Sequence, residues 1–153
     1  MAPEDFSHLS LRSIAHQVRS ELAAAGLPVT PEDPPPGTAG AQVAIDVAGN
    51  RVTVGWETHA ILRDAAHDAW GDDPFGKGAE LAAFTRLRTT IHTTMRDSMS
   101  TILTAAGFEV VKATEQLHVL RRLEMSPWQA RRDAHFDSRH ERKVTTWRQR
   151  EEG

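Results

Sequence analysis

The sequence contains no cysteine, no tyrosine and no long hydrophobic run. Without cysteine, disulfide bonds, thiolate catalysis and metal sites with sulfur ligands are excluded. A membrane-spanning helix needs about 18 or more consecutive apolar residues, and none is expected here. The first ten residues carry acidic side chains instead of a cationic stretch, so a secretory signal is not expected either. These absences favour a cytoplasmic protein.

The composition indicates one domain and an uneven distribution of charge. A chain of 153 residues is long enough for a hydrophobic core. Residues 1–115 carry 9 basic and 15 acidic side chains, whereas residues 116–153 carry 9 basic and 6 acidic ones. A basic C-terminal segment that follows an acidic part of the chain suggests that this segment binds a partner. Arginine outnumbers lysine fifteen to three, which is typical of a GC-rich bacterial genome.

The first part of the chain reads as a helix, a linker and a hairpin. Residues 5–25 have apolar side chains at the helical period, and Gly26 ends that helix. Residues 28–40 contain five prolines and two glycines, and they predict an extended linker. Residues 41–57 alternate between apolar and polar side chains around Gly49-Asn50, a pair typical of a two-residue hairpin turn. That turn pairs Val47 with Val52.

Two helices are expected next. Residues 58–70 predict a short helix with a buried stripe, and Gly71 ends it. Residues 78–106 predict a long amphipathic helix of about seven turns, which Gly107 ends. Ile102 is expected in its core, with Ile102→Ala costing about 2–5 kcal/mol. The short helix's stripe consists of Ile61, Leu62, Ala65, Ala66 and Trp70.

A second hairpin and a last helix complete the chain. A turn at Ala113-Thr114 sets Val110 opposite Leu117 and Glu109 opposite His118. Residues 126–150 predict a helix, because Ser126, Pro127 and Gln129 form a capping pattern. This helix has few apolar residues, so we expect it to be an extension that contacts a partner. The residues expected in that contact are Trp128, Arg131, Arg132, Phe136, Arg139, Arg142, Lys143 and Trp147.

No residue pattern in the sequence indicates a catalytic site, a cofactor or a metal. The eight histidines include no pair at the spacing of three or four residues that a helical metal site requires. No serine lies in a nucleophile motif. Arg88 is different, because it falls inside the apolar stripe of the long helix. It could bind an anion in a pocket, or it could lie along the core with its charged group in water.

These patterns together predict a two-layer α+β domain over residues 1–125 with a basic helical extension over residues 126–153. The element order is α-β-β-α-α-β-β-α, and an antiparallel sheet of two hairpins packs one face on helices. The sequence leaves the strand order open. We expect a non-enzymatic bacterial interaction module that binds another protein or a second copy of itself, through the open sheet face and the terminal helix. The alternatives are a nucleic-acid-associated regulator that uses the basic helix and an enzyme that uses histidines.

Overall fold

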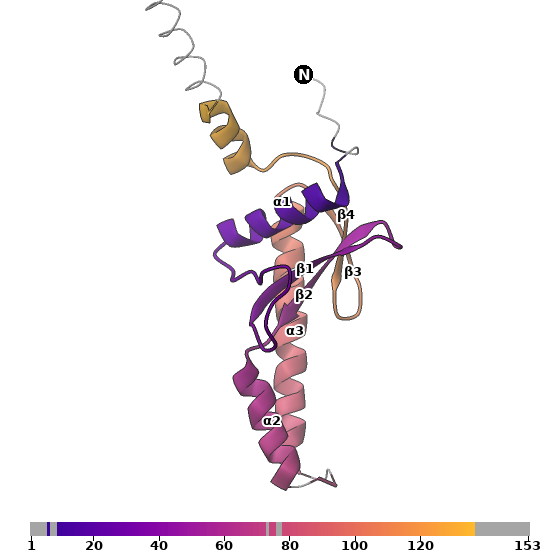
Figure 1. The fold of residues 1–153 in the computed structure, drawn as a ribbon, viewed down its shortest axis with the longest axis vertical. Coiled ribbons are helices and arrows are strands. Elements are labelled where there is room, and N and C mark those ends of the chain that lie inside the picture. The colour runs from indigo at the N-terminus through magenta and orange to yellow at the C-terminus, as the bar shows by residue number, and fades with distance from the viewer. Residues whose placement is uncertain (1–5, 7–8, 73, 76–77, 137–153) are drawn as a thin grey trace, which may run out of the picture.

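The computed structural model describes residue 6 and residues 9–72, 74–75 and 78–136. The elements are α1 (Leu11–Ala24), β1 (Gly40–Asp46), β2 (Arg51–Glu57), α2 (Ala60–Asp72), α3 (Ala79–Ala105), β3 (Phe108–Lys112) and β4 (Leu117–Arg122). A further helix covers residues 127–136. The predicted order and the α+β class are therefore confirmed (Figure 1). No helix among the described residues is both long enough and apolar enough to cross a membrane.

The four strands form one antiparallel sheet in the order β1-β2-β4-β3. The two hairpins meet where β2 pairs with β4, with Val52 opposite Val119 and Val54 opposite Leu117. One face of the sheet packs against α1 and the C-terminal part of α3, as predicted for a two-layer domain. The core contains these buried side chains, among others: Ile14, Val18, Leu22, Val43, Val52, Val54, Met99, Leu103, Phe108, Leu117 and Val119.

The register predicted for the first hairpin is wrong by two residues. Val52 pairs with Ile45, and the last pair before the turn is Asp46 with Arg51. Val47 is therefore unpaired and 79% exposed. The Asp46 carboxylate explains the longer turn, because it accepts hydrogen bonds from the Gly49 N–H at 3.0 Å and from Arg51 Nε at 2.9 Å. Both hydrogen bonds stabilise the charged carboxylate and so lower the pKa of Asp46. The bond from the Gly49 amide has the larger effect, and the bond from Arg51 comes second.

The second hairpin also has a four-residue turn where two residues were predicted. Lys112 pairs with Leu117, and Val110 pairs with Val119 instead of Leu117. A β-bulge between Glu109 and Val110 then shifts the register, so that Glu109 lies opposite Arg121. Their side chains form an ion pair at 2.6 Å, which replaces the predicted contact between Glu109 and His118. The longer turn therefore accounts for the two-residue error at Val110, and the bulge adds one further residue of shift at Glu109.

Only the C-terminal part of α3 belongs to the core. Met99, Ser100 and Leu103 are its buried residues, whereas the N-terminal part of the helix lies beyond the sheet beside α2 (Figure 1). Ile102, predicted as a core residue, packs against the core but is only partly buried. Leu103, the next residue along, is fully buried. The helix is thus rotated slightly from the predicted phase.

Leu103→Ala is therefore expected to cost about 2–5 kcal/mol of unfolding free energy, the usual range for a truncated core leucine. Ile102→Ala should cost less, about 1 kcal/mol, because its side chain already meets solvent. Urea denaturation of both variants, followed by circular dichroism, measures the difference. Equal losses of unfolding free energy in the two variants would mean that Ile102 and Leu103 are equally buried, which contradicts the described orientation of α3.

Candidate functional site

The terminal helix begins against the body of the protein. The Trp128 indole N–H donates a hydrogen bond to Glu21 of α1 at 2.9 Å, and Ser126 is buried. Arg131 and Arg132 are exposed, and Phe136 is 69% exposed. The other residues expected in the partner contact lie outside the described part of the chain: Arg139, Arg142, Lys143 and Trp147.

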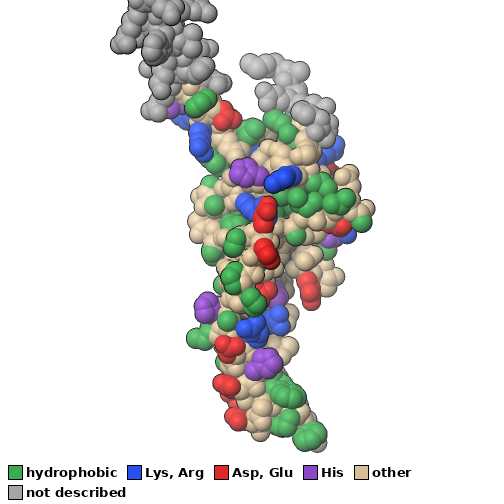
Figure 2. Space-filling model, viewed as in Figure 1, with side chains coloured by type: hydrophobic (Ala, Val, Ile, Leu, Met, Phe, Trp, Pro, Cys, Tyr) green, Lys and Arg blue, Asp and Glu red, His purple; other side chains and the backbone are tan. Residues whose placement is uncertain are grey.

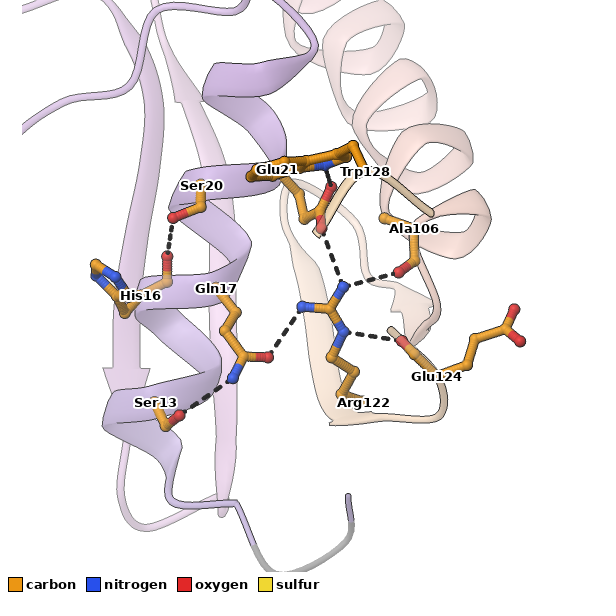
Figure 3. Close-up of polar contacts among 9 residues, drawn as sticks. All are labelled: Ser13, His16, Gln17, Ser20, Glu21, Ala106, Arg122, Glu124 and Trp128. Atoms are coloured by element: carbon orange, nitrogen blue, oxygen red, sulfur yellow. Dashed lines mark hydrogen bonds and ion pairs between the residues drawn. The ribbon is translucent and has the colours of Figure 1, made fainter. Parts of the chain in front are cut away.

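A buried arginine of β4 holds this junction together (Figure 3). The side chain of Arg122 has no exposed surface, and it forms an ion pair with Glu21 at 3.0 Å. Its guanidinium also donates to the Gln17 side chain, to the Ala106 carbonyl and to the Glu124 carbonyl. Because Glu21 accepts from both Arg122 and Trp128, one cluster joins α1, the end of α3, β4 and the terminal helix.

The α2 helix and the N-terminal part of α3 form an arm that projects away from the sheet (Figure 1). Only Ala69 is buried among the residues of α2. The predicted buried stripe is wrong at two positions, since Ile61 is 66% exposed and Trp70 is 53% exposed. Phe75, in the loop between the two helices, is 93% exposed. In Figure 2 hydrophobic side chains gather at the free end of the arm.

The sequence contained a signal for this exposure that the prediction did not use. The stripe from Ile61 to Trp70 spans about 180° of the helix circumference at about 100° per residue. A single neighbouring helix covers a narrower arc. The α2 helix packs with one side on α3. Ile61 and Trp70 lie at the two edges of the stripe, so they remain exposed to solvent.

A groove of about 640 Å³ runs between α2 and α3. Arg88 lines it, together with Arg63 and the two histidines His67 and His92. Arg88 is exposed, and its side chain forms no hydrogen bond or ion pair with another residue in the described part of the chain. The remaining lining residues are Glu57, Thr58, Leu62, Ala66, Trp70, Leu81, Phe84, Thr85, Thr89 and Glu115.

The uncovered face of the sheet is the other surface expected to bind a partner. Arg51 lies there beside His118, with Nη1 and Nδ1 separated by 3.2 Å. Val111 and Leu120 are 48% and 39% exposed on β3 and β4. The face is therefore partly polar, with a small apolar area. Within the described ranges, no three histidine, aspartate or glutamate side chains are grouped closely enough to hold a metal ion.

Comparisons with protein-family models, with curated proteins and with solved structures gave no match for this chain.

Proposed function

We propose that this protein is a non-enzymatic interaction module, and that the arm is its main contact surface. The observation that supports this proposal is the exposure of large apolar side chains on a segment with almost no core. Ile61, Phe75 and Leu87 are 66%, 93% and 46% exposed, whereas α2 buries only Ala69. Large apolar side chains exposed on a projecting element favour a protein-binding surface.

The arm adds little to the packing of the domain, which also favours a contact role. The core cluster contains residues of α1, the sheet and the C-terminal part of α3, but no residue of α2. A pair of helices that buries so little surface gains little stability from its own packing. A partner that covers the exposed side chains would supply the missing burial, at about 25 cal/mol for each Å² of apolar surface removed from water.

The terminal helix is the second contact surface in this proposal. It lies at the opposite end of the molecule from the free end of the arm (Figure 1). Phe136 is an exposed aromatic side chain there, and Arg131 and Arg132 are exposed beside it. The bond between Trp128 and Glu21 fixes the first turn of this helix. Two surfaces at opposite ends would suit an adaptor that joins two proteins or two copies of itself.

The double substitution Ile61→Ser/Leu87→Ser is expected to abolish binding through the arm while the domain stays folded. Both side chains are exposed in α2 and α3, and neither lies in the core. Serine removes their apolar surface without adding charge. Affinity capture from an extract of the source cells measures binding to other proteins. Light scattering of the purified protein measures self-association, and circular dichroism verifies the fold.

The matched control is Val111→Ser/Leu120→Ser, which removes two exposed apolar side chains from the uncovered sheet face. We expect this control to retain the partners that the arm variant loses. The proposal would be wrong if the arm variant kept every partner of the unaltered protein, or if the unaltered protein bound neither another protein nor itself. If only the control variant lost its partners, the contact surface would be the uncovered sheet face and not the arm.

A further inference from the structure

The lining of the groove between α2 and α3 changes in character along its length. Towards the free end of the arm the lining is apolar, with Trp70 from α2 and Leu81 and Phe84 from α3. Towards the sheet it is basic, with Arg63 from α2 and Arg88 from α3. The two helices run in opposite directions, so residues early in α2 lie beside residues late in this part of α3 (Figure 1).

We propose that this groove binds a small amphipathic anion. Its aromatic or acyl body would lie on the apolar part, and its carboxylate, sulfonate or phosphate group would lie between Arg63 and Arg88. The volume of about 640 Å³ lies within the range of small-molecule sites. This site is separate from the contact surface proposed above, because neither Ile61 nor Leu87 lines the groove.

The basic part of the groove is built from two pairs of side chains at helical spacing. Arg63 and His67 are four residues apart on α2, and Arg88 and His92 are four residues apart on α3. Residues at this spacing share one face of a helix, so each pair points towards the same groove. Within the described ranges, the one carboxylate that pairs with the Arg63 guanidinium is that of its neighbour Asp64, at 3.7 Å with both side chains exposed. Neither guanidinium is therefore firmly held by a carboxylate of the described residues.

His92 is a further polar side chain of the groove. Its Nε2 atom is shielded from solvent and has no hydrogen-bond partner among the described residues. A shielded polar atom without a partner costs free energy, and His92 lines the groove beside the arginines.

Two carboxylates define the end of the groove nearest the sheet. Glu57 is the last residue of β2, and Glu115 lies in the turn between β3 and β4. They would repel an anion that moved towards the sheet and so would keep its charged group at the arginines. Removing one of these charges should therefore strengthen the binding of a simple anion.

The test uses anilinonaphthalene sulfonate, which carries a sulfonate on an apolar aromatic body, and its uncharged analogue N-phenylnaphthylamine. Fluorescence titration measures their affinities for the full chain. Arg88→Gln is expected to weaken sulfonate binding about tenfold, since a hydrogen bond to a charged group is lost. The matched control is Arg86→Gln, because Arg86 is also an exposed arginine of α3 but does not line the groove. It should change the affinity less than about twofold.

The uncharged analogue should bind the Arg88→Gln variant as it binds the unaltered protein, and Glu57→Gln should tighten sulfonate binding. Arg63→Gln is a second test of the basic part of the groove, and it should weaken sulfonate binding about as much as Arg88→Gln does. Equal effects of Arg86→Gln and Arg88→Gln would overturn the proposal, as would equal affinity for the charged and uncharged probes. Absence of saturable sulfonate binding would overturn it too, while leaving the protein contacts of the arm unaffected.

Discussion

Arg122→Ala is expected to destabilise the protein by about 3–5 kcal/mol, the range for removing one partner of a buried ion pair. Glu21 is 5% exposed and would stay buried without its charged partner. The Ala106 and Glu124 carbonyls would each lose a donor. The guanidinium also lies 4.5 Å from the centre of the Phe108 ring, and this contact would be lost. Urea denaturation followed by circular dichroism gives the change in unfolding free energy.

The neighbouring arginine provides the control for this experiment. Arg121 is 52% exposed, and its ion pair with Glu109 lies on the surface. Arg121→Ala should cost less than about 1 kcal/mol, as exposed ion pairs usually do. A second comparison replaces both buried partners, in Glu21→Met/Arg122→Met, and should destabilise less than Arg122→Ala because no unpaired charge remains. Similar losses for Arg121→Ala and Arg122→Ala would contradict the buried cluster.

Gly107→Ala is expected to cost about 2–5 kcal/mol, the sum of a left-handed backbone cost and a packing collision. Gly107 has a φ of 101°, which L side chains rarely adopt. A Cβ atom there would collide with the Glu124 carbonyl oxygen. The Gly107 carbonyl also accepts hydrogen bonds from the Leu123 and Glu124 N–H groups. A shift at Gly107 would therefore disturb the segment that joins β4 to the terminal helix.

Gly26 separates the two causes, because it also follows a helix and also has a positive φ, of 90°. A Cβ atom at Gly26 would meet no heavy atom within 4 Å. Gly26→Ala should therefore show only the backbone cost, about 1–2 kcal/mol. Thermal and urea denaturation of the two variants test this difference. If Gly107→Ala lost no more than Gly26→Ala, the close approach to Glu124 would not hold in solution.

The Arg122 cluster also links stability to the proposed function. Arg122 holds Glu21, and Glu21 accepts the hydrogen bond from Trp128 that fixes the first turn of the terminal helix. A substitution that weakens the cluster would therefore destabilise the core and would also loosen the attachment of the terminal helix, one of the two proposed contact surfaces. The arm has no residue in this cluster, since its helix α2 lies at the other end of the molecule (Figure 1). Contacts through the arm should consequently depend much less on Arg122.

The sequence by itself determined the order and type of the elements. Its helical and alternating periodicities, with glycines at helix ends such as Gly26 and Gly107, were sufficient because they reflect interactions between residues close in the chain. It also placed Arg88 on the apolar side of the long helix, where the structure has the groove. Periodicity does not show how much of an apolar stripe a neighbour covers, so the exposure of Ile61 and Trp70 was missed.

The tertiary structure alone decided the strand order, the registers and the burial of Arg122. The β2–β4 pairing joins segments more than sixty residues apart, and sequence periodicity carries no information about such distant contacts. Both hairpins have four-residue turns, the first held by Asp46, and these turns changed both registers. The bulge at Glu109 shifted the second register further, and alternation encodes neither feature. Arg122 is buried because Glu21, Gln17 and two carbonyls converge on it only in the folded chain. A buried charge is stable only with such partners.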